Sequence, residues 1–141
     1  MIKKTPSRTK FRKSHKMHQS GAQYSGNTVA FGEFGLQAVS NGLIKPNQIE
    51  SVRVAINRSL KKSGKIIIRA FPDKPVTKKT IGSRMGKSKG NVEYWVMPIL
   101  RGRVIVEIRG VTKERAHAAF KKAQYKLGFA TRIVAGHMLS S

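Results

Sequence analysis

Charge is the feature of this sequence that most narrows what the chain can fold into. Its 141 residues include 29 Lys and Arg but 6 Asp and Glu, which gives a formal net charge of +23. A compact chain of this length has a radius of gyration of roughly 14 Å. Like charges confined to that space repel one another and oppose folding. The folded state therefore needs a negatively charged companion: nucleic acid, an anionic membrane or an acidic protein.

The composition otherwise fits one ordinary domain. Hydrophobic residues make up 39% of the chain, enough to build a modest core. The absence of Cys excludes disulfides, thiolate metal sites and a Cys nucleophile. No run approaches the roughly 20 apolar residues that span a bilayer. The basic N-terminus lacks the apolar stretch of a secretory signal, although an Arg- and Ser-rich start is also compatible with an organellar transit peptide.

Residues 1–26 form a region of distinct character. The region is rich in Lys and Arg, and the first acidic residue of the chain is Glu33. Its apolar residues are too few to bury a core of their own. We therefore predict an extended basic arm that is ordered only on its negatively charged partner, followed by a single globular domain over residues 27–141.

The pattern of residues 27–141 predicts an α+β fold, with two helices packed on a mixed or antiparallel sheet. The helices are expected over residues 46–62 and 113–127, where apolar residues recur at helical spacing. Pro46 suits a first helical position, and Gly64 and Gly128 suit helix ends. Thr112 is a candidate N-cap. β-Branched and alternating stretches predict strands over residues 28–39, 65–71, 92–100, 103–109 and 129–135. Arg101-Gly102 predicts a hairpin turn between the third and fourth of these strands.

The segment between residues 71 and 92 has no clear period, and its sequence is PDKPVTKKTIGSRMGKSKGN. A structureless loop of this length inside a domain is uncommon and usually functional or disordered. Gly82, Gly86 and Gly90 recur every four residues and let the backbone approach a partner closely. We predict a protruding basic loop over residues 73–91.

Three sequence features could indicate an enzyme or a metal site, but each is weak. Residues 82–88 resemble the phosphate-binding loop of NTPases, but three residues separate the glycines where four are required, and a strand follows instead of a helix. His15 and His18 have no Cys or acidic neighbour and make a poor metal site. The few carboxylates are spread singly, which disfavours a paired acid–base site. We predict no catalytic residue, metal, cofactor or small-molecule substrate.

Aromatic residues beside basic or loop sequence have two readings. Phe11, Tyr24, Tyr94 and Trp95 are suited either to stacking on exposed RNA bases or to core packing. Tyr94 and Trp95 are adjacent on a predicted strand, so one should point inward and the other outward.

Both predicted helices have polar faces that lean positive, where a solvated surface normally mixes both signs. This asymmetry favours contact with phosphate on several sides, as within large folded RNA. Two alternatives remain: an independent nucleic-acid chaperone or DNA-compacting protein, and a cationic membrane-surface protein. The second needs a wide apolar helix face, whereas the stripes here are narrow.

Four strings together resemble the bacterial-type large-subunit ribosomal protein number sixteen. They are RTKFRKSHKM (residues 8–17), FGEFGLQAV (31–39), GKIIIRAFPDKPVTKK (64–79) and RMGKSKGNVEYW (84–95). Their order and spacing match this family across almost the whole chain. The chain departs from the family's usual residues at Ile67, at residues 100–103 and at Arg109, which suggests a divergent lineage from a bacterial or an organellar ribosome.

The resemblance implies a non-catalytic component of the large subunit that joins late in assembly. Its implied partners are large-subunit rRNA near the central protuberance, A-site and P-site tRNA, and neighbouring ribosomal proteins, with no membrane partner. In that family the basic arm and loop penetrate rRNA, and the loop extends toward the peptidyl-transferase region. The RNA contacts that we predict are Arg8, Lys10, Arg12, Lys13, His15, Lys16, Lys74, Lys78, Lys79, Arg84, Lys87 and Lys89.

Overall fold

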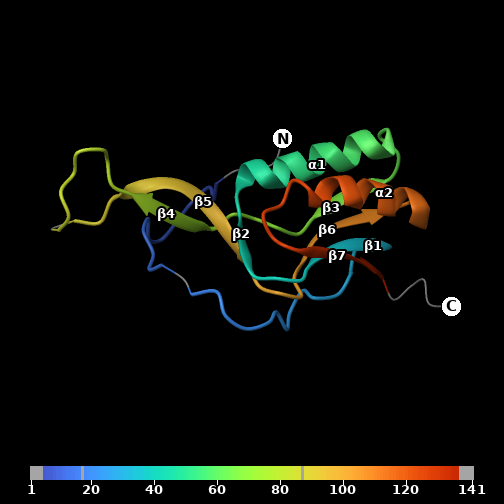
Figure 1. The fold of residues 1–141 in the computed structure, drawn as a ribbon, viewed down its shortest axis with the longest axis horizontal. Helices are drawn as coiled ribbons and strands as arrows, with labels where there is room; N and C mark the ends of the chain where they lie inside the picture. Colours follow the sequence, from blue (N-terminus) through green and yellow to red (C-terminus); the bar gives the residue numbers. More distant parts are fainter. Residues whose placement is uncertain (1–4, 17, 87, 137–141) are drawn as a thin grey trace.

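The computed structural model describes residues 5–16, 18–86 and 88–136. It has a helical layer over a sheet at one end and a long β-hairpin that projects from the other (Figure 1). The elements are β1 (Phe34–Ala38), β2 (Gly42–Ile44), α1 (Pro46–Leu60), β3 (Lys65–Ile68), β4 (Lys74–Lys78), β5 (Asn91–Ile99), β6 (Val104–Arg109), α2 (Lys113–Gln124) and β7 (Thr131–Ala135). The predicted α+β class is confirmed.

Two sheets share the strands. One has four strands in the order β3-β6-β1-β7, and the other has three in the order β2-β5-β4. All pairs of named strands are antiparallel. The two helices pack against each other over the four-stranded sheet (Figure 1).

Helix α1 buries the apolar stripe that its sequence predicted. Ile49, Val52, Ile56 and Leu60 are at most 1% exposed. The helix begins at Pro46, and the Lys45 backbone N–H donates to Gln48 Oε1 at 2.8 Å. It ends at Leu60, slightly before the predicted end, because Lys61 and Lys62 adopt positive φ angles of 51° and 65°. The left-handed backbone stops the helix before Gly64 is reached.

Helix α2 buries Ala116, Ala119, Phe120 and Ala123 in the same core. Thr112 occupies the N-cap position, but its hydroxyl makes no capping hydrogen bond. The helix ends at Gln124, so Gly128 is not its stop signal. Small residues along this face let α2 lie close to α1 and to the sheet.

The predicted hairpin at Arg101-Gly102 is wrong. The chain does turn there, and Gly102 has a φ of 95°. The strands on either side nevertheless belong to different sheets, because β5 pairs with β2 and β4 while β6 pairs with β1 and β3. This turn therefore passes the chain from the hairpin layer into the sheet beneath the helices.

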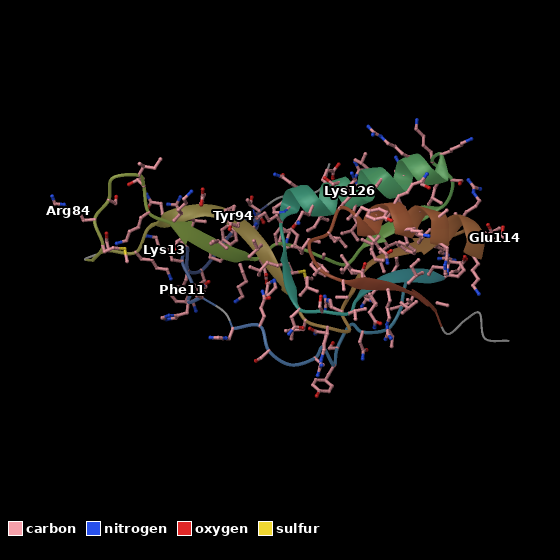
Figure 2. All side chains as sticks on the ribbon, viewed as in Figure 1. Phe11, Lys13, Arg84, Tyr94, Glu114 and Lys126 are labelled. Carbon is pink, nitrogen blue, oxygen red and sulfur yellow. The ribbon has the colours of Figure 1, made fainter. Side chains whose placement is uncertain are left out.

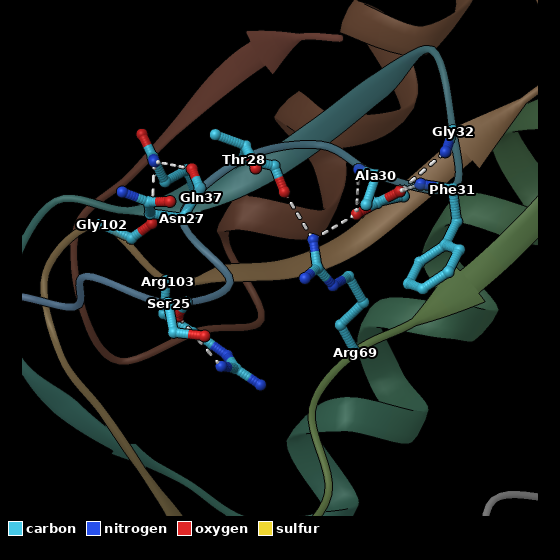
Figure 3. Close-up of polar contacts among 11 residues, drawn as sticks. Ser25, Asn27, Thr28, Ala30, Phe31, Gly32, Gln37, Arg69, Gly102 and Arg103 are labelled. Carbon is cyan, nitrogen blue, oxygen red and sulfur yellow. Dashed lines mark hydrogen bonds and ion pairs between the residues drawn. The ribbon is translucent and has the colours of Figure 1, made fainter.

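Two buried polar side chains, Gln37 and Glu107, bind the segment that leads into β1. Gln37 donates through Nε2 to the carbonyls of Asn27 at 2.7 Å and Gly102 at 2.8 Å (Figure 3). Residues 28–33, predicted as the start of a strand, are instead a loop, since β1 begins at Phe34. That loop is fixed to the sheet by Glu107.

Glu107 is fully buried in the middle of β6. Its carboxylate accepts hydrogen bonds from the backbone N–H groups of Phe31 at 2.6 Å and Gly32 at 2.7 Å. It also pairs with Arg69 Nη1 at 2.6 Å, and the same nitrogen donates to the Thr28 carbonyl at 2.6 Å (Figure 3). The alternating sequence of β6 did not predict this buried carboxylate. Alternation suggests that one face of a strand is exposed, whereas every residue from Val104 to Ile108 is buried.

Candidate nucleic-acid interface

The β4–β5 hairpin carries the segment that was predicted to be a structureless loop. Strand β4 pairs with β5 from Lys74 opposite Val96 to Lys78 opposite Asn91, so the loop proper spans residues 79–90. The prediction of irregular structure from residue 73 was therefore wrong at its start. β4 is an edge strand, where a proline such as Pro75 is tolerated because no sheet hydrogen bond is required of it.

The loop is held by its own hydrogen bonds. Lys79 Nζ donates to the carbonyls of Arg84 at 3.2 Å and Gly86 at 3.1 Å. Gly82 and Gly86 have φ angles of 86° and 112°, which glycine adopts without strain. Lys79, predicted to contact RNA, thus serves to shape the loop.

The tip of the loop combines one cation with two apolar side chains. Arg84 points away from the body at the far end of the hairpin (Figure 2). Ile81 and Met85 beside it are 104% and 94% exposed. Sequence reasoning selected Arg84 for its charge and missed both apolar residues, whose exposure is evident only once the hairpin is known to project. Lys87, also predicted to contact RNA, lies outside the described residues.

The basic arm lies alongside this hairpin. Lys13 Nζ donates to the Lys89 carbonyl at 3.0 Å, and Lys89 Nζ donates to the Ser14 carbonyl. These reciprocal contacts join positions 76 and 75 residues apart in sequence. Further along, Gln23 N–H donates to the Arg101 carbonyl at 2.8 Å. The arm and loop cations therefore share one region of the molecule (Figure 2).

The predicted site residues in this region are largely accessible. The arm residues are exposed, as are Lys78, Arg84 and Lys89, whereas Lys74 and Lys79 are half-buried. Lys78 pairs with Glu93 at 3.5 Å, and both side chains are well exposed, so the pair contributes little stability. The exposed arm residues in the predicted set are Arg8, Lys10, Arg12, Lys13, His15 and Lys16.

Tyr94 and Trp95 occupy the base of the hairpin. Both are half-buried, so exposure alone does not distinguish an inward ring from an outward one. Lys45 Nζ lies 4.7 Å from the centroid of the Tyr94 ring. Phe11 and Tyr24 in the arm are 77% and 90% exposed, which leaves their rings available for stacking.

The described residues hold no cluster of three or more His, Cys, Asp and Glu side chains that could bind a metal. His117 is exposed on α2, and His137 lies outside the described residues. In the part of the chain that the structure describes, neither helix has the length and apolar character needed to cross a membrane. The chemistry that this region offers is that of a cationic surface with exposed rings.

Comparison with known proteins yields one family. Residues 6–134 match the family described as ribosomal protein L16p/L10e. A large ribosomal subunit protein uL16 from Francisella tularensis subsp. holarctica is 55% identical over 129 residues, which cover 92% of this chain and 94% of the relative. Proteins of the same description from Xanthomonas oryzae pv. oryzae and Xanthomonas axonopodis pv. citri are 53% identical over the same shares of each chain.

Proposed function

The chain belongs to the ribosomal protein L16p/L10e family, and from this premise we propose that its arm and hairpin bind large-subunit rRNA. The protein is a structural constituent of the large ribosomal subunit and not an enzyme. The observation that carries the proposal is the joining of arm and hairpin by Lys13 and Lys89. The arm, which cannot fold alone, is brought against a hairpin that projects from a folded body.

The division of labour between the segments follows from their composition. Residues 1–26 supply cations along an extended path, and residues 27–141 form the body that fixes the geometry of the protruding hairpin. Phosphate contacts of this kind position a protein on RNA without reading its sequence. The predicted contacts in the arm and hairpin belong to this class, and Lys79 also shapes the loop from within.

The hairpin tip has a second task under this proposal. Its reach suits contact with A-site and P-site tRNA near the peptidyl-transferase region, with the body seated below the central protuberance. Arg84 offers a planar fork that grips phosphate or a base edge through two hydrogen bonds. Neighbouring large-subunit proteins complete the surroundings, and the protein joins the subunit late in assembly.

The relatives' source supports a bacterial ribosome. Francisella and Xanthomonas are bacteria, and their proteins share the family across nearly the whole chain. We therefore favour the bacterial cytoplasm over an organelle as the location of the ribosome that contains this protein.

The arm's part is tested by removing charge and measuring affinity for large-subunit rRNA fragments at several salt concentrations. Changing Arg8, Lys10 and Arg12 to Gln removes three cations. The slope of log K against log salt should become shallower by about 2, since each lost phosphate contact contributes roughly 0.7–0.9. An unchanged slope would contradict the arm's role.

A matched control changes Ser7, Thr9 and Ser20 to Gln, which alters the same arm without removing charge. Its slope should equal that of the wild type. Competition with duplex DNA separates this function from DNA compaction, because a ribosomal protein should keep its preference for rRNA as salt rises.

A further inference from the structure

A pocket of about 450 Å³ lies between the arm and the β4–β5 hairpin. The arm forms one wall, strands β4 and β5 form the other, and β2 closes one end through Leu43. The lining residues that matter below are Lys16, Lys74, Lys89, Tyr94 and Val96.

The pocket is apolar inside and cationic at its edge. Val96 is 3% exposed, and the proline, valine and leucine side chains around it add a non-polar wall. Lys16 and Lys74 lie on opposite sides, one on the arm and one on β4. No acidic residue lines the pocket, so its charge complements an anion.

When the arm is ordered, Lys89 links the arm wall of the pocket to the hairpin. Its Nζ donates to the Ser14 carbonyl, while its own carbonyl accepts from Lys13 Nζ at 3.0 Å. Because Lys89 is engaged in closing the pocket, Lys16 and Lys74 are the lysines best placed to meet a phosphate.

Tyr94 supplies a flat surface inside the pocket. Its ring lines both this pocket and a neighbouring hollow of about 700 Å³ between the start of the arm and the start of α1. Lys45, whose ammonium lies 4.7 Å from the ring centroid, lines only the larger hollow. Because Lys45 does not line the smaller pocket, the side of Tyr94 that borders this pocket is left free of that cation.

We propose that this pocket receives the base of one unpaired RNA nucleotide, stacked on Tyr94, with its phosphate between Lys16 and Lys74. An aromatic ring in an apolar cavity with lysines at the edge matches a splayed-out nucleotide, which presents a flat base and an anion together. The volume is too small for a duplex. This inference rests on the rRNA-binding function proposed above, and it adds a stacked base to a surface otherwise made of phosphate contacts.

The test compares Tyr94→Leu with Tyr94→Phe in binding to large-subunit rRNA fragments. Stacking on an aromatic contributes about 1–3 kcal/mol per base, so Tyr94→Leu should weaken binding about tenfold or more, whereas Tyr94→Phe should bind within about twofold of wild type. The salt slope should not change for either variant, because no phosphate contact is removed.

Leu43→Trp provides a second variant, which fills the pocket from β2 at a position that is 49% exposed. Circular dichroism checks that each variant is folded. If Tyr94→Leu does not fold, the result with Leu43→Trp decides whether the pocket receives a base. Dimethyl sulfate probing of the bound rRNA should reveal a base that is protected by wild type and Tyr94→Phe but reactive with Tyr94→Leu and Leu43→Trp.

Folded variants that bind like wild type and leave every base equally protected would overturn the nucleotide pocket. That result would not contradict the proposed rRNA-binding function. The rRNA-binding function would instead be contradicted if binding of the wild-type protein to rRNA hardly depended on salt.

Discussion

Glu107 shows how one buried charge can determine the path of a basic chain. Its carboxylate is fully buried, and it is satisfied by Arg69 and by the backbone N–H groups of residues 30–32. An intact buried pair adds little stability over apolar packing, but losing one partner leaves the other uncompensated. Glu107 therefore matters chiefly because it fixes the loop that leads into β1.

Replacing Glu107 with Gln should lower the free energy of unfolding by about 3–5 kcal/mol, because Arg69 loses its counter-charge in a buried setting. Urea unfolding at fixed ionic strength measures the change. Glu114→Gln, at an exposed position on α2, is the matched control and should shift stability by less than about 0.5 kcal/mol. Equal effects of the two substitutions would contradict the role given to Glu107.

Arg84 should affect function without affecting folding. Arg84→Ala should leave the domain folded and incorporated into subunits, since Arg84 points away from the body at the far end of the hairpin (Figure 2). Peptide-bond formation or tRNA accommodation should slow by roughly tenfold for Arg84→Ala, if one charged hydrogen bond of about 1.5 kcal/mol supports the step.

The measurement is subunit occupancy alongside the peptide-bond rate on purified ribosomes. Arg58→Ala, which removes an exposed arginine from α1 instead, is the control and should retain the normal rate. Normal rates with Arg84→Ala at full occupancy would refute a functional tip, and lower occupancy alone would assign the loop to assembly.

At the scale of elements, local pattern was sufficient for the helices and insufficient for strand pairing. The apolar stripes of α1 and α2 are buried as predicted, because helical periodicity is a property of neighbouring residues. The partners of β5 and β6 are distant in sequence, so a turn at Gly102 gave no information on which sheet each strand would join. Strands β2 and β4 were missed because one is short and the other contains Pro75.

The candidate interface was predictable in its charges and not in its arrangement. Clustered Lys and Arg with few acids indicated the arm and loop directly, and the family resemblance is confirmed. The contacts of Lys13 with Lys89, and the pocket beside Tyr94, join segments far apart in sequence. No local pattern contains that information.

The parts of the arm before and after about residue 22 should differ in mobility. Exposed lysine-to-carbonyl bonds hold residues 5–16 against the hairpin, and such contacts are weak in water. Residues 22–26 are instead tied by backbone bonds from Gln23 to Arg101 and from Val104 to Gly26, at 2.8 and 3.0 Å. We predict that residues 5–16 are disordered in the free protein and become ordered on rRNA.

Amide hydrogen exchange followed by NMR, with and without an rRNA fragment, tests this division. Gln23 and Val104 should be protected in both states, and residues 8–13 only with RNA. Protected, dispersed resonances for residues 8–13 in free protein would show that the arm folds without RNA.

At the scale of the whole molecule, positive charge is not confined to the hairpin and arm. The groove between α1 and α2 is lined by Arg58, Lys122 and Lys126 together with the exposed ring of Tyr125. Lys126 and Arg84 lie at widely separated places on the molecule (Figure 2). This distribution suits a protein enclosed by folded RNA more than one that docks through a single face.

Binding of the whole protein to rRNA fragments should depend steeply on salt. With about 8 phosphate contacts, log K should fall by roughly 6 for each tenfold rise in salt, because every contact releases about 0.7–0.9 counterion. Filter binding between low and moderate salt gives the slope. A slope shallower than about 2 would argue against electrostatic attachment.

Sedimentation tests the central claim most directly. A native lysate is separated on a density gradient at high salt, and each fraction is probed for this protein and for large-subunit rRNA. A structural constituent of the large subunit should travel with that rRNA in constant proportion and should be scarce at the top of the gradient. Release into the light fractions, or migration with DNA, would contradict a ribosomal role and favour an independent nucleic-acid chaperone.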